Sequence, residues 1–465
     1  MMLKALLCTA AIIAVPAAAQ PLKPDQQAFF EMYKELVETN TTLSAGSCTV
    51  AAEQIAKRLK AAGFRDSDLT LFAAPENPRE GGLVAVLPGT DAGAKPILLL
   101  AHLDVVEAKR EDWTRDPFKL VEENGFYYAR GTADDKAQAA IWTDTMIRYK
   151  QAGRAPKRTL KLALTCGEET TNAFNGADWL AKNRPALIAA EYALNEGGGG
   201  RLSPEGKPMG MSVQVGEKTV QNFKLEATNP GGHSSVPRPD NAVTDLADAI
   251  VRINRHEFPV QFNDTTTSFF KTMAPVMPSG MGTAVTSLIA NPGDAAANAI
   301  VSKDPQFHSM LRTTCVTTLV NAGHANNALA QRATANVNCR MFPGTDPEVL
   351  RGQLAAIIAN PKVGVTLEAP VRPVAKAPPM NPAVIGPMQA LVAKHFPGVP
   401  FVATMSTGAT DSIFLSPIGI PTYGAPGFYG DSDGNGVHGL NERVRVASVY
   451  QARDYLDELV NTLAN

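Results

Sequence analysis

Apolar runs alternate with amphipathic segments over the first half of the chain and predict its layout. Four short runs rich in aliphatic residues predict buried strands, at residues 82–88, 96–101, 159–166 and 191–195. Two segments between them carry an apolar stripe and predict helices, at residues 135–149 and 176–183. Strands that alternate with helices predict an α/β sheet covered on both faces, in which ligands bind at the carboxyl ends of the strands.

The middle of the chain has a different order of elements. The pattern predicts, in chain order, a strand at 219–228, a helix at 242–255, strands at 313–321 and 332–342, a helix at 346–358 and a strand at 363–369. This β-α-β-β-α-β order is typical of a small two-layer α+β domain. Residues 256–312 are predicted to be irregular, and the proline-rich residues 370–382 are predicted to be a linker.

Helix and strand signals resume after this linker and continue to Leu463. The simplest arrangement is one α/β domain, formed by residues 20–215 and 372–465, that is interrupted by an inserted α+β domain at residues 216–371. A length of 465 residues agrees with this division, because single cores usually stop growing near about 250–300 residues.

The composition excludes several classes of protein. Hydrophobic residues make up 45% of the chain and charged residues 19%, which predicts a folded protein rather than a disordered one. The formal net charge is −2, from 43 basic and 45 acidic residues. Without a broad basic excess, the chain lacks the charge that would neutralise a phosphate backbone, so we expect no nucleic-acid partner.

Residues 1–19 have the features of a cleavable signal peptide. Lys4 precedes an apolar run, residues 5–15, that is too short to span a bilayer, and residues 17–19 form an Ala-x-Ala cleavage site. We therefore expect cleavage near Ala19 and a periplasmic or secreted protein. The mature form would carry no membrane anchor, because no later stretch is long and apolar enough to span a membrane.

Four cysteines follow the signal peptide, and none belongs to a Cys-x-x-Cys motif. They are Cys48, Cys166, Cys315 and Cys339. An oxidising compartment permits disulfides, and Cys315 and Cys339 lie on the two strands of a predicted hairpin. The sequence leaves open whether this pair forms a disulfide or two free thiols.

Histidines and carboxylates recur just past predicted strands and in two loops. The residues are His102 with Asp104, Asp134 with Asp135, Glu168 with Glu169, Glu196, and His438. Singly, each has an ordinary interpretation, such as a packed histidine, a helix N-cap or a solvated charged surface. Together they suit zinc, manganese or cobalt, and two ions that share a carboxylate form a two-metal hydrolase. One of the adjacent glutamates could bind metal while the other takes a proton from water.

Two other motifs bear on the chemistry. Residues 431–442 match the spacing of an EF-hand calcium loop, but no helix precedes them and His438 falls inside the loop. Calcium binding therefore stays open as an alternative. The chain contains no Gly-x-Ser-x-Gly, which argues against a serine hydrolase.

The ordered set of motifs resembles the M20 family of dinuclear zinc exopeptidases and amidohydrolases. The resemblance covers nearly the whole mature chain and extends to Pro230-Gly231-Gly232-His233-Ser234-Ser235, Asn326-Asn327 and Cys339-Arg340. The chain looks most like the carboxypeptidase S branch, which also holds enzymes that act on N-acyl amino acids. The resemblance implies a zinc-exopeptidase-type α/β catalytic domain that is interrupted by an inserted α+β lid domain.

The resemblance also implies a role for each motif. Two zinc ions, or cobalt or manganese, would be bound by His102, Asp134 as the bridge, Glu169, Glu196 and His438. Glu168 would be the general base for a metal-bridged water, Asp104 would orient His102, and the Asp134–Asp135 peptide would be cis. On the lid, His233 would stabilise the oxyanion, across the subunit interface in dimeric members. Asn327 and Arg340 would hold the carboxylate of the substrate.

The implied activity is that of an exported exopeptidase, of carboxypeptidase or dipeptidase type, that hydrolyses the amide bond next to a free carboxylate. The alternatives are an N-acyl-amino-acid amidohydrolase and, from another class, a non-catalytic binding protein on the same fold. The family also implies a homodimer through the lid domain. One departure concerns the substrate: many relatives have an arginine where this chain has Ile413, so a second cation is missing there.

Overall fold

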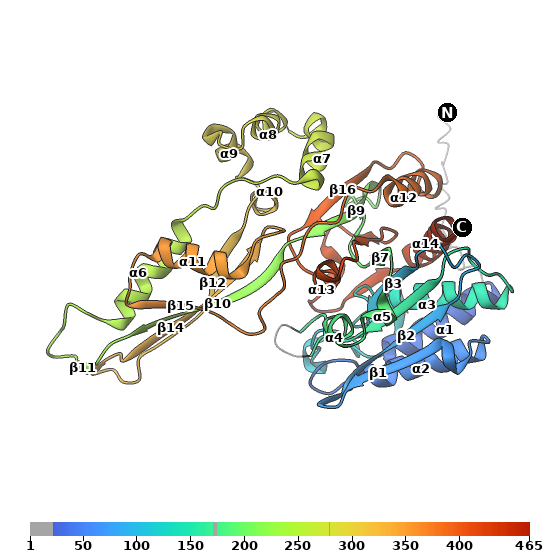
Figure 1. Ribbon diagram of the computed structural model, residues 1–465, viewed down its shortest axis with the longest axis horizontal. Helices are drawn as coiled ribbons and strands as arrows, with labels where there is room; N and C mark the ends of the chain where they lie inside the picture. Colours follow the sequence, from blue (N-terminus) through green and yellow to red (C-terminus); the bar gives the residue numbers. More distant parts are fainter. Residues whose placement is uncertain (1–21, 171–173, 279) are drawn as a thin grey trace, which may run out of the picture.

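The computed structural model describes residues 22–170, 174–278 and 280–465. The predicted signal peptide, residues 1–19, lies outside the described residues. Figure 1 shows a large α/β body and an elongated second region that extends away from it. Within the described part of the chain, no helix has the length and apolar character needed to cross a membrane.

The α/β body is built on a ten-stranded sheet, which confirms the predicted fold class. Its strands are β1 (Leu69–Ala74), β2 (Asn77–Leu87), β3 (Ile97–His102), β6 (Leu160–Thr165), β7 (Tyr192–Asn195), β8 (Gly198–Leu202), β9 (Pro208–Glu217), β16 (Phe401–Ser406), β17 (Thr422–Gly424) and β18 (Tyr429–Gly430). Their order is β1-β2-β6-β3-β7-β17-β9-β8-β18, and β16 pairs with β9. Strand β3 runs parallel to both β6 and β7, so the carboxyl ends of these three strands meet at one edge.

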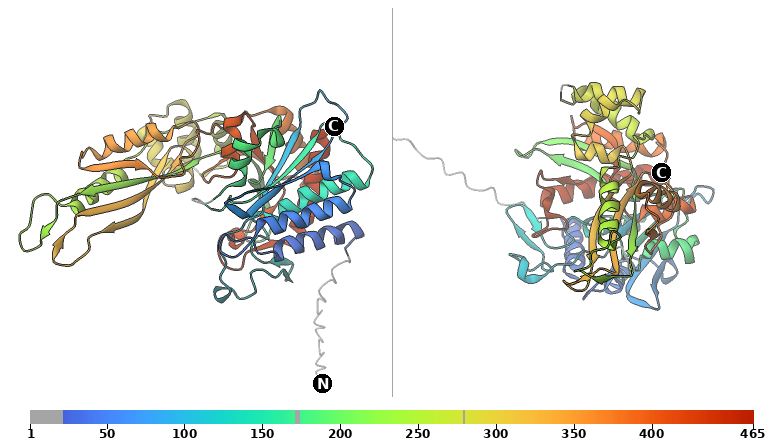
Figure 2. Two further views of the ribbon diagram at one scale, coloured as in Figure 1. Left: turned by 60° about the horizontal axis from the view of Figure 1, so that its bottom comes forward. Right: turned by 90° about the vertical axis from the view of Figure 1, so that its left-hand side faces the viewer.

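Helices cover both faces of this sheet (Figures 1 and 2). One face packs against α1 (Pro24–Glu38), α2 (Cys48–Ala61), α3 (Lys136–Gln151), α12 (Pro382–His395) and α14 (Val446–Ala464). The other face packs against α4 (Gly176–Asn183), α5 (Pro185–Ile188) and α13 (Ser412–Leu415). All six residues of β3 are buried, because a strand covered on both faces must be apolar along its whole length.

A small three-stranded sheet lies beside the main one and joins two distant parts of the chain. It consists of β4 (Val121–Glu123), β5 (Phe126–Tyr128) and β19 (Arg443–Arg445), in the order β19-β5-β4. Strand β5 leads into the loop of Asp134, and β19 follows the loop of His438. The pairing of β5 with β19 therefore brings these two loops together.

The second region has its own sheet and its own hydrophobic core. The antiparallel sheet has the order β12-β14-β10-β15, formed by β10 (Thr219–Thr228), β12 (Thr314–Ala322), β14 (Arg332–Met341) and β15 (Val363–Leu367). Helices α6 (Ala242–Arg255) and α11 (Pro347–Ile358) pack on it. Alternate residues of β10 and β14 are buried, as in a sheet with one covered face. The six elements lie within a few residues of the positions that the sequence predicts.

The prediction that residues 256–312 are irregular is wrong. They form α7 (Asp264–Met273), α8 (Met281–Ala290), α9 (Ala295–Val301) and α10 (Pro305–Met310). These helices enclose a separate small core that includes Phe270, Leu288 and Leu311. None is longer than 10 residues, which is too short for a helical period to stand out in the sequence.

Short elements complete the chain. Strands β11 (Gly232–His233) and β13 (Ala328–Leu329) pair at the far end of the second region (Figure 1). The described residues also include the 3₁₀ helices η1 (Asp66–Asp68), η2 (Arg110–Asp112), η3 (Ala274–Val276), η4 (Ser416–Ile418) and η5 (Gly434–Gly436). The segment from 368 to 381 has neither helix nor strand, as expected for the predicted linker.

Two disulfides join the four cysteines of the described chain. Cys315 and Cys339 face each other across β12 and β14, with their Cα atoms 4.1 Å apart, and form a disulfide. Of the two possibilities that the sequence leaves open for this pair, a disulfide or two free thiols, the structure has the disulfide. The second disulfide joins Cys48, at the start of α2, to Cys166, just after β6. It was not predicted, because its cysteines are 118 positions apart and no local pattern connects them.

Candidate metal centre and active site

The predicted ligands converge at the carboxyl edge of the main sheet. His102 is the last residue of β3, Glu168 and Glu169 follow β6, and Glu196 follows β7. Asp134 lies in the loop between β5 and α3, and its peptide bond to Asp135 is cis, as the family resemblance implies. The parallel register pairs His102 with Thr165, so the ends of β3 and β6 lie side by side.

Asp134 lies between two imidazoles. Its Oδ1 is 3.1 Å from Nε2 of His102, and its Oδ2 is 3.1 Å from Nε2 of His438. Both carboxylate oxygens of Glu169 lie 2.9 Å from Nε2 of His438. Oε1 of Glu196 lies 3.8 Å from Nε2 of His102. The cluster therefore divides into two halves, one around each histidine, that share Asp134.

This donor set fits two divalent ions. Ligand atoms at about 2.0–2.2 Å from a tetrahedral zinc ion lie roughly 3.3–3.6 Å from one another. The distances of 2.9–3.8 Å within the cluster bracket that spacing. Imidazole nitrogen with carboxylate oxygen suits zinc, manganese or cobalt. Within this cluster, two groups have ligand atoms within 4.8 Å of one another, namely His102 with Asp134 and Glu169, and His102 with Glu168 and Glu196.

The electrostatics of the cluster agree with a cation site. Burial, together with neighbouring carboxylates, raises the pKa of Glu168 and Glu196 well above the usual value. Hydrogen bonds to Asp134 and Glu169 raise the pKa of His438 to about 10. Burial thus favours the neutral form of the two glutamates, the carboxylates around His438 favour its charged form, and hydrogen bonds to the two histidines lower the pKa of Asp134.

Asp104 holds His102 and the glutamate loop together. Nδ1 of His102 lies 3.0 Å from the main-chain oxygen of Asp104 and 3.6 Å from its carboxylate. A Nδ1–H donor to that oxygen leaves the Nε2 lone pair facing Asp134, as a metal ligand requires. The Asp104 carboxylate accepts hydrogen bonds from the backbone N–H groups of Glu168 and Glu169.

Glu442 supports the Asp134 loop in the same way. Its carboxylate lies 2.7 Å from Nη1 of Arg130 and accepts hydrogen bonds from the backbone N–H groups of Gly131, Ala133 and Asp134, at 2.8–3.2 Å. Both side chains of the Arg130–Glu442 pair are at most 3% exposed. The sequence places Glu442 in a motif, but this positioning role could not be predicted because Arg130 is 312 positions away.

The structure does not favour the calcium alternative, because the acidic residues of that loop have other partners. Glu442 is paired with Arg130, Asp431 with Arg445 at 2.9 Å, and Asp433 with Arg443 at 2.6 Å. A calcium loop needs its carboxylates to converge on one ion.

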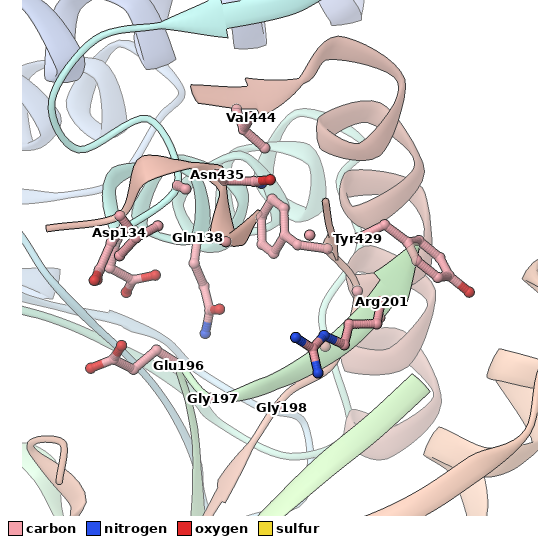
Figure 3. A pocket seen from close by; sticks show the side chains of 18 of the residues that line it. Asp134, Gln138, Glu196, Gly197, Gly198, Arg201, Tyr429, Asn435 and Val444 are labelled. Carbon is pink, nitrogen blue, oxygen red and sulfur yellow. The ribbon is translucent and has the colours of Figure 1, made fainter. Parts of the chain in front are cut away.

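Two cavities adjoin the cluster. One, of about 340 Å³, lies between the two bodies and is lined by Glu168, Glu169 and His438 from the α/β body and by Arg340 from β14. The other, of about 390 Å³, is shown in Figure 3, where Asp134 and Glu196 lie at one end and Arg201 and Tyr429 at the other. The two cavities share no lining residue among those described. The cluster thus has space on two sides.

Two of the predicted lid residues do not reach this site within one chain. His233 is exposed on β11, and the backbone oxygen of Asn327 accepts a hydrogen bond from the N–H of Ser234 beside it. Both therefore lie at the far tip of the second region, while the metal cluster lies in the α/β body (Figure 1). Arg340 is the predicted lid residue that lines the cleft.

Comparisons with known proteins agree with this geometry. Residues 98–462 match the profile of peptidase family M20/M25/M40. The human N-fatty-acyl-amino acid synthase/hydrolase PM20D1 is 26% identical over 452 residues, which cover 94% of this chain and 88% of that protein. A probable carboxypeptidase S-like 2 from Dictyostelium discoideum is 26% identical over 80% of this chain and 72% of that protein. The M20 family metallo-carboxypeptidase Sso-CP2 from Sulfolobus solfataricus has the same fold, with a TM-score of 0.69, 19% identity, and coverage of 94% of this chain and 99% of that chain.

The substitution Glu442→Gln tests the support of the Asp134 loop. It leaves the Arg130 charge buried without its partner, so we expect the metal-free protein to lose about 3–5 kcal/mol of unfolding free energy. Asp433→Asn is the matched control: it removes the exposed Asp433–Arg443 pair and should cost less than about 1 kcal/mol. Urea denaturation measures both, and equal losses would contradict the role assigned to Glu442.

Proposed function

The chain belongs to peptidase family M20/M25/M40, and from this premise we propose that it is an exported zinc-dependent exopeptidase. It hydrolyses the amide bond next to a free carboxylate. The observation that carries this proposal is the position of Arg340, which enters the same cavity as Glu168 and Glu169. A guanidinium group is a fork of hydrogen-bond donors that matches a carboxylate, so it selects the terminal residue of a substrate.

The proposed mechanism assigns one task to each part of the site. His102, Asp134, Glu169, Glu196 and His438 would hold two zinc ions. The ions, when bound, would polarise the substrate carbonyl and lower the pKa of the attacking water. Glu168 accepts the proton of that water and then donates it to the leaving amine. The Asp104 carboxylate keeps Glu168 in place by accepting a hydrogen bond from the backbone N–H of Glu168. Arg340 orients the substrate so that the scissile amide of the substrate lies beside Glu168.

N-acyl-amino-acid hydrolysis is the second candidate, and two observations favour it. Relatives from several vertebrates are named N-fatty-acyl-amino acid synthase/hydrolase. In addition, the cavity of about 390 Å³ at Asp134 and Glu196 has the size of a small-molecule pocket. An acyl chain in that cavity would leave its amino-acid carboxylate on the side of Arg340. Both candidates therefore share the requirement for a free carboxylate.

A hydrolysis screen with the zinc-loaded protein tests the proposal. The panel contains dipeptides, blocked peptides, and N-acetyl and N-dodecanoyl amino acids, each as the free acid and as the carboxamide. We expect the acid to be preferred by roughly 10- to 100-fold in kcat/KM, because a hydrogen-bonded ion pair is lost on amidation. Equal rates for acid and amide would refute the assignment of Arg340 and the exopeptidase proposal with it.

Two glutamate variants serve as controls for the same assay. Glu168→Gln should keep both metal ions and lower kcat by about 10²- to 10⁴-fold, because it removes only the proton acceptor. Glu169→Gln should lose bound metal as well as activity, because a ligand is missing. Metal content is measured by elemental analysis. Full activity of Glu168→Gln with both ions bound would show that another group is the base.

We further propose a homodimer in which His233 and Asn327 of one copy serve the cleft of the other. Their place at the exposed tip of the lid supports this arrangement, and an isologous contact would exchange the two tips. Mixing inactive His233→Ala protein with inactive Glu168→Gln protein should then restore about a quarter of wild-type activity, because half of the dimers are mixed and each has one intact site. No recovery after subunit exchange would mean that His233 does not act across an interface.

Export of the protein remains a proposal that rests on residues 1–19 and is supported by the two disulfides. Mass spectrometry of the exported protein should give a chain that begins near Gln20. Titration of the denatured, unreduced protein should find no free thiol among Cys48, Cys166, Cys315 and Cys339. An intact N-terminus with five reactive thiols, Cys8 included, would contradict export.

A further inference from the structure

The cavity of about 390 Å³ beside the metal cluster contains two hydrogen-bond donors that the proposed mechanism does not use. One is the side-chain amide of Gln138, and the other is the guanidinium group of Arg201. Figure 3 shows both groups extending into the cavity, with Asp134 and Glu196 at the end where the metal ions would bind. A substrate whose scissile amide lies at that end would place its acyl group beside these two donors.

Gln138 is buried, and its amide donor is unpaired. The residue lies in the first turn of α3, and its side chain is 3% exposed. Its Nε2 has no hydrogen-bond partner among the residues that the structure describes. Buried donors in folded proteins are almost always paired, so an unpaired one at the wall of a cavity indicates that a ligand with an acceptor binds there.

Arg201 lies on β8, on the far side of a run of glycines. Residues 197–200 are all glycine and all line the cavity, so no side chain of this segment stands between Arg201 and Glu196. The guanidinium group of Arg201 makes no hydrogen bond or ion pair with the described part of the chain. It is therefore available to an anion inside the cavity.

The acidic residues that line the cavity leave this charge uncompensated. Asp134, its neighbour Asp135 and Glu196 belong to the metal end. Asp431 is paired with Arg445 at 2.9 Å. Of the described residues that line the cavity, Arg201 alone is basic. The part of the cavity away from the metal end thus presents one positive charge together with the amide donor of Gln138.

We propose that this cavity is a subsite for an acyl group that carries a second carboxylate, which pairs with Arg201 and accepts a hydrogen bond from Nε2 of Gln138. The inference rests on the proposed function. A plain aliphatic chain would leave the donor of Gln138 unpaired, and along residues 197–200 it would meet backbone rather than apolar side chains. The carboxylate has two sources: a dicarboxylic acyl group, or the side chain of an acidic amino acid on the amino side of the scissile bond.

Binding to a protein that cannot turn over its substrate tests the subsite. In the zinc-loaded Glu168→Gln protein, calorimetry measures the affinity for N-glutaryl-leucine, for its distal carboxamide and for N-pentanoyl-leucine. We expect the distal acid to bind roughly 10- to 100-fold more tightly than either neutral compound, because both of these lack the ion pair. Glutamyl-leucine and glutaminyl-leucine form a second pair, in which an amino acid supplies the same carboxylate.

Three variants in the same background assign the two donors. Arg201→Gln should remove most of the preference for the distal acid over the distal amide, and Arg201→Lys should keep part of it. Gln138→Leu should weaken N-glutaryl-leucine roughly 3- to 10-fold more than it weakens N-pentanoyl-leucine. Lys207→Gln is the matched control and should leave all affinities unchanged, because this exposed cation follows β8 but lies outside the cavity. Thermal unfolding of each variant shows whether its fold is retained.

The ligand series separates the outcomes. A preference for the acid within the glutaryl compounds assigns the subsite to dicarboxylic acyl groups, and one within the glutamyl pair assigns it to acidic amino acids. Equal affinity for acids and their neutral counterparts overturns the inference, and so does a preference that survives Arg201→Gln. The α-carboxamide of N-glutaryl-leucine tests the proposed function separately. If amidation of the leucine carboxylate does not weaken binding, the proposed function fails, whatever the result for the distal carboxylate.

Discussion

Negative charge gathered in partly buried side chains at one edge of a sheet is the constraint on which the rest of this site depends. Asp134, Glu168, Glu169 and Glu196 converge there with only two imidazoles among them. Carboxylates at such distances repel one another, and burial denies them the screening of water. The set becomes favourable in its ionised form only when cations lie between its members. The same excess of negative charge therefore favours the binding of divalent cations by this cluster.

Two further carboxylates hold the backbone against this repulsion. The Asp104 carboxylate accepts hydrogen bonds from the backbone of the loop that carries Glu168 and Glu169, and the Glu442 carboxylate accepts them from the backbone of the Asp134 loop. Neither needs to touch metal or substrate for its loss to disturb the site. The disulfide between Cys48 and Cys166 adds a covalent restraint, because Cys166 directly follows β6 and lies two residues before Glu168. The ligands are thus fixed by hydrogen bonds and a cross-link from elements that are distant in sequence.

The difference between the ligands and the distant residues that hold them explains which parts of the site the sequence could predict. A ligand such as His102 ends an apolar strand, and strand ends can be recognised from local pattern. The role of Glu442 could not be predicted, because it depends on Arg130, which only the complete fold brings near. The same holds for the disulfide of Cys48, and the helices of 256–312 were missed because each is too short to show a period.

The positions of the two cavities give the reaction a direction. Glu168 and Arg340 line one cavity, whereas Glu196 lines the other. A base that must protonate the leaving amine has to lie on the side of that amine. In the proposed reaction the leaving amino acid would occupy the cavity of Arg340, and the acyl part would extend past Glu196 towards Arg201. Differences in the acyl group would therefore act through the second cavity, while recognition of the carboxylate would depend on Arg340, which β14 of the second region contributes.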